Sequence, residues 1–457
     1  MNKKPLIMMH MEVYKREIIS RLYLAMHLAK NEGYQILIGN IEEYAKSKCG
    51  SGIYFNKDHG LWSEGSLRKI KENGYYVTAF DEEGLIYASD SVYNQSRGAK
   101  NSIDQCDAIF LWGEKQLETI NSNPSLSLKK KYISGSVKFD FYRLLNSMRS
   151  NLPPKKVLIN TRFTNINGLT SSFEEFIENL EHLGFIKGES DRENYYQSYN
   201  ADKLIYKEFE NLIEILGSNN DISVTIRPHP AENIDKYECF QKKFSNITVD
   251  SNRELLEQIL EHDCVIHDAC TTGIEAMCIG VPVYSLRPDN LNGAYVALAN
   301  EFSLKFNNAL SLYEELISKE NINFEISNES NLEYYIDNWG KNKSAVDSIS
   351  KVFNSFDVDK VPVFNRLKGA ITIKEMVYDC IENICSHLIS KNLLSRNTKL
   401  YNLVEKRRKR KVIFPKISKD DILDKAMFLC EYDKTLGELS NYTIRKTSSQ
   451  SFVVYCE

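Results

Sequence analysis

At 457 residues, of which 42% are hydrophobic, the chain is too long for one ordinary core and too apolar for a disordered protein, so we expect two domains with a further segment. A formal net charge of −4 gives no general reason to expect nucleic acid as a partner. Ten cysteines without a C-x-x-C pair or a zinc-like spacing are typical of reduced thiols in a cytosolic protein.

The sequence predicts neither a signal peptide nor a membrane span. Asn2-Lys3-Lys4 is followed by a short apolar stretch that His10 interrupts. No apolar run approaches the roughly 20 residues that a spanning helix needs. We therefore expect a soluble or peripheral protein in the cytoplasm, and contact with the inner face of the cytoplasmic membrane is a further hypothesis.

The beginning of the chain predicts an open parallel sheet. Pro5 to Met9 is a short apolar run typical of a buried strand, an apolar stripe of helical period follows from about Arg16, and Tyr34 to Ile38 is the next strand. Glu12, Arg16 and Glu17 come after the first strand, at the end where a ligand would bind, so we assign them to the acceptor. The alternative is a solvated helix start.

An acidic turn is predicted after a later strand. Gly50 to Gly60 has the composition of a loop, Leu67 to Glu72 looks helical, and Tyr75 to Phe80 reads as a strand that ends in Asp81-Glu82-Glu83-Gly84. Consecutive carboxylates repel one another, which can raise the pKa of one of them. Such a group can take a proton from an acceptor hydroxyl. The alternative is an acidic loop in solvent.

Leu152 to Lys156 has the composition of an interdomain linker. We therefore place a first, acceptor-side domain at 1–152, a nucleotide-binding domain at 153–325 and a helical extension at 326–457. The second domain begins with a strand at Val157 to Ile159, and we assign Asn160, in the polar loop that follows, to the acceptor or the sugar. A largely helical stretch with an exposed charged loop at 188–194 comes next.

Two apolar runs in this second domain each end in a short polar turn. The first, ISVTIRPHP, stops at Arg227-Pro228-His229-Pro230, because proline cannot extend a sheet ladder. The second, CVIHDACTTGIEAMCIGVPVYSL, predicts a strand, a turn, a helix from about Gly273 and another strand. Such a unit implies a parallel sheet with ligands at the carboxyl ends of its strands, so both turns are predicted to face one crevice.

The residues of these turns are suited to a nucleotide. Thr271, Thr272 and Gly273 open a helix, whose free N–H groups and positive dipole end can hold a phosphate. Arg227 and His229 supply further donors, and Glu275 can accept hydrogen bonds from ribose hydroxyls. The alternatives are that a threonine is only the N-cap of the helix and that the histidine is structural.

RPHP together with HDACTTGIEA resembles bacterial surface-carbohydrate biosynthesis proteins, and more broadly the GT-B glycosyltransferases that use CMP-activated ulosonic acids. That group includes capsule Kdo transferases and bacterial sialyltransferases, which carry a His-Pro motif and an acidic D/E-D/E-G motif. Both motifs occur here, as His229-Pro230 and as Glu82-Glu83-Gly84. The resemblance covers about residues 1–290. It departs from the family at Lys138, in Gly-Ser-Val-Lys where related proteins usually have Gly-Asn-Pro-Arg.

The resemblance implies an α/β protein of the GT-B type, with two doubly wound Rossmann-like domains facing a cleft. It implies transfer of Kdo or a nonulosonate, such as sialic, legionaminic or pseudaminic acid, from a CMP donor to a surface-glycan precursor for capsule or lipopolysaccharide. No metal or other cofactor is expected. His229 would bind or protonate the departing phosphate, Glu82 or Glu83 would act as base or nucleophile, and Glu275 would hold the ribose.

Two alternatives stay open at this point. One is a transferase of the same architecture with CDP-glycerol or a UDP-sugar as donor, and the other is a non-catalytic nucleotide-binding protein of glycan assembly. The sequence does not name the sugar, the acceptor or its linkage, the stereochemical outcome or the oligomeric state.

The C-terminal extension is predicted to be helical and charged. Two helices are expected between Asn328 and Phe364, followed by an amphipathic segment from Ile371 to Leu394. It continues into six consecutive cations: Lys406, Arg407, Arg408, Lys409, Arg410 and Lys411. Such a run can bind anionic lipid head groups at about 1 kcal/mol per charge. The alternative is a solvated helix end.

Overall fold

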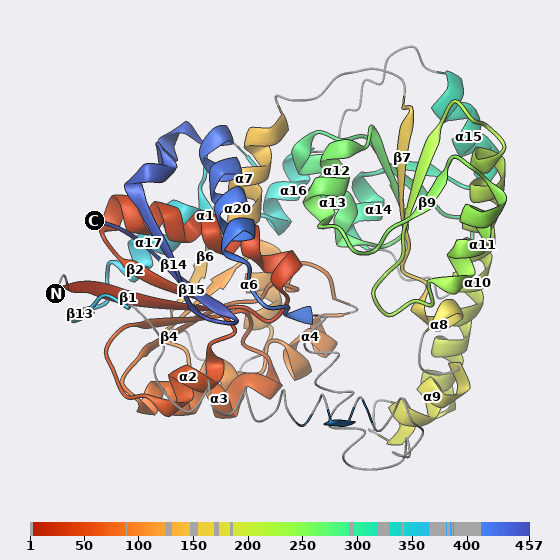
Figure 1. Ribbon diagram of the computed structural model, residues 1–457. Helices are drawn as coiled ribbons and strands as arrows, with labels where there is room; N and C mark the ends of the chain where they lie inside the picture. The colour runs from red at the N-terminus through yellow and green to blue at the C-terminus, as the bar shows by residue number, and fades with distance from the viewer. Residues whose placement is uncertain are drawn as a thin grey trace. The chain divides into compact units, whose positions relative to one another are not determined.

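The computed structural model describes residues 3–87, 89–123, 130–146, 154–168, 173–182, 186–291, 297–318, 329–340, 342–364, 381, 384, 385, 387 and 413–457. The chain divides into two compact units. Unit 1 contains residues 1–141 and 332–457, and unit 2 contains residues 142–331. Each unit is an α/β structure built on a largely parallel sheet (Figure 1), as the sequence predicted.

Unit 1 has the sheet order β14-β15-β2-β1-β3-β4-β5-β6, with β13 paired to β1. The strands are β1 Lys3–His10, β2 Gln35–Gly39, β3 Ile53–Asn56, β4 Tyr76–Phe80, β5 Ala108–Leu111, β6 Lys131–Ile133, β13 Lys360–Pro362, β14 Tyr442–Ser448 and β15 Ser451–Cys456. The helices are α1 Tyr14–Glu32, α2 Glu42–Ser47, α3 Glu64–Glu72, α4 Asp90–Ser96, α5 Lys100–Ile103, α6 Glu114–Asn121, α7 Val137–Leu145, which continues into unit 2, α16 Glu329–Tyr335, α17 Ala345–Phe353 and α20 Lys419–Tyr432.

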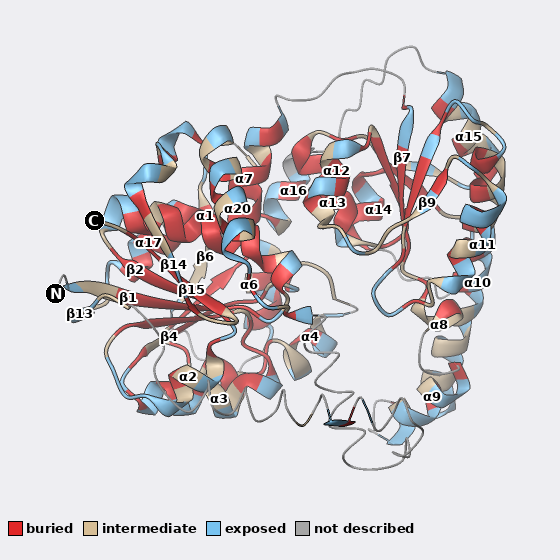
Figure 2. Cartoon of the chain, in the orientation of Figure 1, coloured by how far each residue is buried: buried red, intermediate tan, exposed pale blue. Residues whose placement is uncertain are grey.

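Helices cover both faces of this sheet: α1, α17 and α20 lie on one face, and α2 and α3 lie on the other (Figure 1). A parallel strand between two layers of helices is buried on both sides, and the strands of this sheet are therefore continuous apolar runs in the sequence. Leu6 and Met8 of β1 face one core while Ile7 and Met9 point to the opposite face, and all four are at most 3% exposed. Buried residues accordingly follow the strands in Figure 2.

Unit 2 has the parallel sheet order β12-β11-β10-β7-β8-β9. Its strands are β7 Lys156–Asn160, β8 Ser223–Arg227, β9 Ile247–Val249, β10 Cys264–His267, β11 Val283–Leu286 and β12 Leu304–Phe306. Its helices are α8 Thr164–Asn167, α9 Phe173–His182, α10 Glu189–Gly217, α11 Asp235–Lys243, α12 Leu255–Glu261, α13 Thr271–Ile279, α14 Leu298–Phe302 and α15 Ala309–Ser318. Figure 1 shows α12, α13 and α14 on one face and α10, α11 and α15 on the other.

Two local predictions were wrong, and a third, of two helices between Asn328 and Phe364, was confirmed but missed a strand. The segment 50–60 contains β3, which pairs with β1 through Ile53, Tyr54 and Phe55, so a short buried strand was hidden among glycines. The predicted loop at 188–194 forms the first turns of α10, where Glu189 and Asp191 suit the positive end of the helix dipole. The segment between Asn328 and Phe364 contains α16 and α17 but also β13.

The C-terminal residues do not form a separate helical extension. β15 pairs antiparallel with β2 through Ser451–Gly39 and Val454–Ile36, and β14 pairs with β15, so a hairpin from the end of the chain extends the sheet of unit 1. The boundary between the units also lies at residue 141 rather than 152. The predicted linker at 152–156 and the predicted amphipathic segment at 371–394 both lie partly outside the described residues.

A substitution at Gly39 can test the pairing of β15 with β2. Its φ of 146° is unfavourable for other residues, and an added Cβ would lie 2.1 Å from the carbonyl oxygen of Gln450. We predict that Gly39→Ala lowers the free energy of unfolding by at least about 3 kcal/mol through strain and overlap. Gly33→Ala is the control, because Gly33 has a φ of 72° but no heavy atom within 4 Å of an added Cβ, and it should cost about 1 kcal/mol. Equal losses in thermal unfolding would contradict the pairing of β15 with β2.

Candidate functional site

The sheet of unit 2 has a switch point between β7 and β10. The chain runs outward from β7 to β8 and β9 on one side, and then from β10 to β11 and β12 on the other. Ligands of open α/β sheets bind at the carboxyl end of such a point. Asn160 ends β7 there, and its Nδ2 donates to the Sγ of Cys270, the residue before α13, at 3.1 Å. Asn160 therefore lies beside the predicted nucleotide residues.

The two predicted turns are close to this point but do not follow neighbouring strands. β7 pairs with both β8 and β10, so the turns at His229 and Thr271 lie on either side of the loop that follows Asn160. They share one sheet edge, because all three strands are parallel and end together. The loop after β7 is therefore the centre of the candidate site, a position that the sequence analysis did not give it.

The helix predicted to begin near Gly273 is α13, which starts at Thr271, and its role toward a phosphate stays a prediction. Thr271 is exposed and Thr272 is buried, and the first N–H groups of a helix have no acceptor within it. A Cβ at Gly273 would lie 2.7 Å from Nε2 of His267 and 3.1 Å from Cβ of Ala299. Gly273 thus allows close packing inside unit 2, and its replacement would test packing rather than phosphate binding.

The RPHP turn presents His229 and turns Arg227 away from it. Arg227 Nη1 donates to the carbonyl oxygen of Arg253 at 2.9 Å and to Gln258 Oε1 at 2.5 Å. The exposed His229 accepts the N–H of Ala231 on Nδ1 at 3.2 Å. Partial burial lowers the pKa of His229, so its neutral form dominates at neutral pH. With Nδ1 accepting, the proton of the neutral ring lies on Nε2, which is therefore a hydrogen-bond donor.

A buried glutamate that the sequence analysis missed fixes this turn. Glu232 is 3% exposed. Its carboxylate accepts hydrogen bonds from the N–H of His229 at 3.2 Å, the N–H of Phe163 at 3.0 Å, and the hydroxyls of Thr161 and Tyr237. Burial raises the pKa of Glu232, and these hydrogen bonds oppose that effect. Glu232 thus ties the loop after β7 to the loop after β8.

Asp268 is a second buried carboxylate that the sequence analysis missed. Its side chain is 0% exposed, and it pairs with Arg162 at 2.6 Å and Arg287 at 3.0 Å. Asn300 donates to the same carboxylate at 3.1 Å and accepts the N–H of Ala269 at 3.1 Å. Three strand ends are thereby connected, and two guanidinium groups are held at the sheet edge. Ala269, at a φ of 47°, is a backbone signal of a constrained turn.

A cavity of about 630 Å³ opens beside this network at the ends of β11 and β12. Its volume lies within the range of roughly 300–1,000 Å³ found for small-molecule sites. The lining includes Arg287 and Asn300, which contact Asp268, together with Asn290, Lys305 and Asn307. Asp289 and Leu291 also border the cavity, and residues 292–296 lie outside the described part of the chain.

Glu275 lies in the second turn of α13. It is 8% exposed, and the hydroxyl of Tyr142 donates to its Oε2 at 3.4 Å. The structure therefore places this carboxylate one helical turn behind the exposed Thr271, in the same unit as His229. Its predicted role toward a ribose stays a prediction.

The acidic turn in unit 1 follows β4, but its three carboxylates have different surroundings. Asp81 is fully buried, which raises its pKa, and Arg97 Nη1 donates to it at 2.9 Å. Glu82 has a side chain that is 7% exposed and pairs with the buried Arg21 at 3.1 Å. Glu83 is 44% exposed and pairs with Arg16 and Arg97. Glu83 is thus the carboxylate of this turn that solvent reaches most freely.

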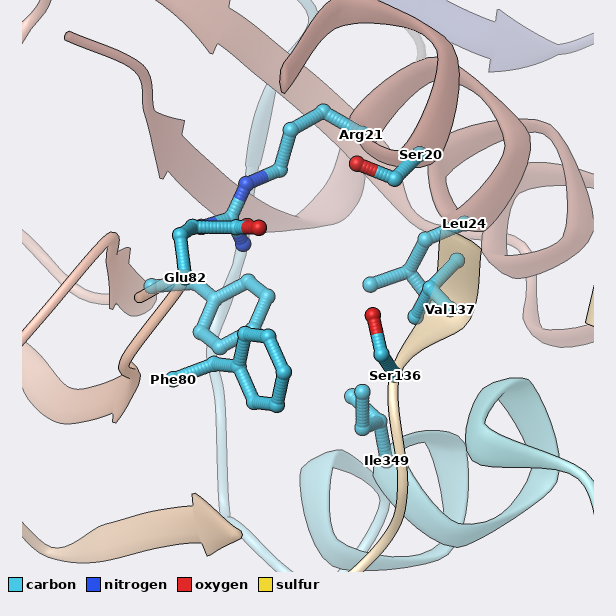
Figure 3. Close-up of a pocket in the computed structure, with 9 residues that line it drawn as sticks. Ser20, Arg21, Leu24, Phe80, Glu82, Ser136, Val137 and Ile349 are labelled. Atoms are coloured by element: carbon cyan, nitrogen blue, oxygen red, sulfur yellow. The ribbon is translucent and has the colours of Figure 1, made fainter. Parts of the chain in front are cut away.

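Figure 3 shows the pocket beside Glu82. Arg21 and Glu82 lie next to one another on one side, while the hydroxyl of Ser136 points toward the centre from the other. The cavity has about 10 Å³, which is the room of a single water molecule. This pocket is too small for a sugar, so any substrate contact of Glu82 requires a rearrangement of its neighbours.

The residues predicted after β1 divide into two groups. Glu17 is 0% exposed and accepts the N–H of Val13 at 2.9 Å and of Glu12 at 3.3 Å, so it fastens the start of α1. Burial and the nearby Glu82 raise the pKa of Glu17. Glu12 is exposed and pairs with Lys57. Arg16 contacts Glu83 at 2.5 Å and thereby joins the acidic turn.

Other predicted features can be placed only in part. The basic run at 406–411 lies outside the described residues. Among the residues that are described, no helix is both long and apolar enough to cross a membrane. The same residues contain no group of three or more His, Cys, Asp or Glu side chains placed to bind a metal ion.

No protein-family model matches the sequence, and no curated protein matches it. Several solved structures are similar. A putative UDP-N-acetylglucosamine 2-epimerase from Listeria monocytogenes has a TM-score of 0.46 at 12% identity, over 79% of this chain and 99% of its own. The wall teichoic acid polymerase TagF has a TM-score of 0.45 at 13% identity, over 77% of this chain and 88% of its own.

The UDP-GlcNAc 2-epimerase from Neisseria meningitidis, solved with UDP-GlcNAc bound, has a TM-score of 0.46 at 13% identity, over 77% of this chain and 100% of its own. Likeness at this level leaves activity and substrate to be argued from the residues of the chain itself.

The burial of His267, at the end of β10 beside the switch point, can be tested by the pH dependence of stability. It is fully buried, its Nε2 lies 2.8 Å from Ser303 Oγ, and burial lowers its pKa to about 4. The unfolded chain takes up the proton near pH 6.5, so this contribution to stability is present above that pH and is lost as the pH falls toward about 4. We predict that His267→Gln, which can keep the donor to Ser303, reduces this acid-induced loss by about 3 kcal/mol.

Denaturant unfolding between pH 7 and pH 4 measures the effect on stability. His182→Gln is the matched control, because His182 is an exposed histidine on α9 of the same unit. An identical pH profile for His267→Gln and the unmodified protein would show that His267 is not held neutral in the folded state.

Proposed function

We propose that the protein is a glycosyltransferase that binds a nucleotide-activated donor at the carboxyl edge of the sheet of unit 2. The observation that carries this proposal is the gathering, at one switch point, of a histidine donor, a helix start and two guanidinium groups. These come from the turn at His229, the start of α13 at Thr271 and the network around Asp268. Anionic ligands are bound by such combinations of helix ends and oriented donors.

The finer proposal is a CMP-activated ulosonic acid as donor, by resemblance of the His-Pro and Glu-Glu-Gly motifs to transferases that use such donors. Charge supports a single phosphate. Arg162 pairs with both Asp202 and Asp268, and Arg287 pairs with Asp268, so little surplus positive charge stays at this edge. A neutral His229 adds a donor without adding a charge. A diphosphate donor, such as CDP-glycerol or a UDP-sugar, would need more compensation and is the alternative.

In this proposal the sugar of the donor enters the cavity at the ends of β11 and β12. The amide groups of Asn290, Asn300 and Asn307 line it and can pair with hydroxyl groups. Lys305 lies on the same lining and can pair with the carboxylate of an ulosonic acid. Glu275 would accept hydrogen bonds from the ribose.

The chemical step needs a group that stabilises the leaving phosphate and one that removes the proton of the acceptor hydroxyl. The Nε2–H of His229 can donate to an oxygen of the departing CMP. A carboxylate of the acidic turn in unit 1 would take the proton if the configuration is inverted, or attack the anomeric carbon if it is retained. We favour Glu83 over Glu82 for this role, because Glu82 is buried against Arg21.

Nucleotide titration tests the donor. We predict that CMP raises the unfolding temperature of the protein more than CDP or UDP does, since a specific ligand stabilises by about 2.7 kcal/mol at 100 times its dissociation constant. His229→Ala and Glu275→Gln should each weaken CMP binding by about tenfold, the loss of one or two good hydrogen bonds. His182→Ala, an exposed histidine in the same unit, is the control. A larger shift with CDP or UDP would select the diphosphate alternative, and CMP binding without turnover of any CMP-sugar would select a non-catalytic role.

Amide substitutions in the acidic turn separate the two glutamates. We predict that Glu83→Gln lowers turnover by at least about a hundredfold with little change in stability, because Glu83 is exposed. Glu82→Gln should instead lower the free energy of unfolding by about 3 kcal/mol, because it removes the ion pair with the buried Arg21. Product analysis by NMR with a panel of CMP-sugars measures turnover. Full activity in Glu83→Gln would remove it from the mechanism.

A further inference from the structure

The loop after β3 carries an exposed tryptophan that no part of the proposed mechanism uses. Trp62 is 55% exposed and Leu61 is 54% exposed, whereas Trp112 and Trp339 are 4% and 6% exposed. The chain has three tryptophans, and all of them lie within the described residues. A large exposed aromatic side chain is often a contact for a ligand or partner, so its surroundings decide what it can bind.

The position of this loop is that of a ligand site. In unit 1 the chain runs from β1 to β2 on one side of the sheet and continues through β3, β4 and β5 on the other, so the switch point lies between β1 and β3. The segment 57–63, which ends in a short 3-10 helix at Leu61–Ser63, follows β3 directly at this point. Lys57, its first residue, pairs across the switch point with Glu12, which follows β1. Trp62 therefore lies close to the edge where open α/β sheets bind ligands.

The indole is held in place before any ligand arrives. Asp58 is 1% exposed, and its carboxylate accepts from Trp62 Nε1 at 3.0 Å, from the N–H of Gly60 at 3.1 Å and from Ser63 Oγ at 2.5 Å. A Cβ on Gly60 would lie 2.5 Å from Cζ2 of the indole, so the ring rests on the Gly60 backbone. More than half of Trp62 is still exposed, and a ring held in this way loses little conformational freedom when a ligand binds to it.

One arginine connects this ring to the acidic turn. Cζ of Arg97 lies 5.5 Å from the centre of the Trp62 ring, and its Nη1 donates to Asp81 at 2.9 Å. Arg97 also pairs with Glu83. The aromatic ring and the carboxylate that we favour for the chemical step thus share a neighbour.

We propose that Trp62, Arg97 and Glu83 form a platform that binds a pyranose ring of the glycan acceptor, an inference that rests on the proposed transferase function. The face of the indole is electron-rich. One face of a pyranose presents C–H bonds whose hydrogens are partly positive, because the neighbouring oxygens withdraw electrons, and the indole attracts them. The guanidinium group and the carboxylate can pair with hydroxyl groups at the rim of that ring.

The charges beside the platform favour a sugar over an anion. Arg16 and Arg97 are both paired with Glu83, and Arg97 is paired with Asp81 as well, so the two cations are balanced by two carboxylates. A phosphate would meet these carboxylates at close range, which is unfavourable, whereas hydroxyl groups can donate to them. A nucleobase is the competing planar ligand, and the experiment separates the two.

Quenching of tryptophan fluorescence by acrylamide in the full-length protein tests the platform, because Trp62 is the exposed member of the three. The probes are methyl pyranosides of glucose, galactose, N-acetylglucosamine and N-acetylneuraminic acid, with glycerol as a polyol that has no ring. We expect at least one pyranoside to lower the quenching constant about twofold, because it would cover the exposed part of the indole. Trp62→Phe should remove the exposed component and confirm the assignment of the signal.

Binding of the protective pyranoside, followed by saturation-transfer NMR, supplies the second measurement. Trp62→Ala should weaken it by about tenfold or more, the loss typical of a stacking aromatic side chain, whereas Trp62→Phe should keep most of it. Leu61→Ala is the matched control, as the equally exposed neighbour, and should leave the affinity unchanged. Protection by cytidine but by no pyranoside would overturn the proposal, as would protection by none of the probes or equal affinities for Trp62→Ala and the unmodified protein.

Failure of this inference and failure of the transferase proposal have different signatures. Pyranoside protection requires no nucleotide and no turnover, so it can be found in a protein that transfers nothing, which would keep the platform and reject the transferase. Turnover of a CMP-sugar with an acceptor affinity that Trp62→Ala does not change would keep the transferase and reject the platform.

Discussion

The candidate sites depend on one constraint, which is that parallel strands end together at one edge of a sheet. In unit 2 the residues after β7, β8, β10 and β11 are far apart in the sequence, yet the pairing of these strands gathers them. The same constraint in unit 1 brings the loop with Trp62 beside the acidic turn. Ligand-binding side chains on loops are therefore positioned by a rigid scaffold, and loop sequence can change without loss of the core.

Buried carboxylates fix the loops that carry these side chains. Glu232 joins the loops after β7 and β8, Asp268 joins the ends of β7, β10 and β11, and Asp58 holds the indole of Trp62. Removing a carboxylate from water is costly unless several hydrogen bonds compensate it, and each of the three has them. The consequence is that exposed donors such as His229 are held in one orientation before a ligand binds, which reduces the entropy cost of binding.

Within the described residues, the sheet of unit 1 has nine strands because the C-terminal part of the chain adds β13, β14 and β15 to it. β2 would otherwise be an edge strand, with a row of unpaired backbone groups next to the apolar run from Ile36 to Ile38. The hairpin of β14 and β15 covers it, and α20 packs against α1 beside it. Tyr23 of α1 also donates to Asp433 after α20, at 2.7 Å, so polar contacts fasten the two segments. The end of the chain is thus part of the first core.

The sequence by itself determined the α/β class, several strands of each sheet and the candidate turns, because apolar runs bounded by proline, glycine and acidic residues are local signals. His229, Thr271 and the acidic turn could be found in this way. Glu232, Asp268 and Trp62 could not, since a lone charged or aromatic residue in a polar stretch looks like ordinary surface until its partners are known. Only the tertiary structure decided that Glu17 is buried at a helix start, that Gly273 packs against Ala299 and that β15 pairs with β2. These are contacts between residues distant in the chain, or choices between burial and exposure, and local sequence does not encode either.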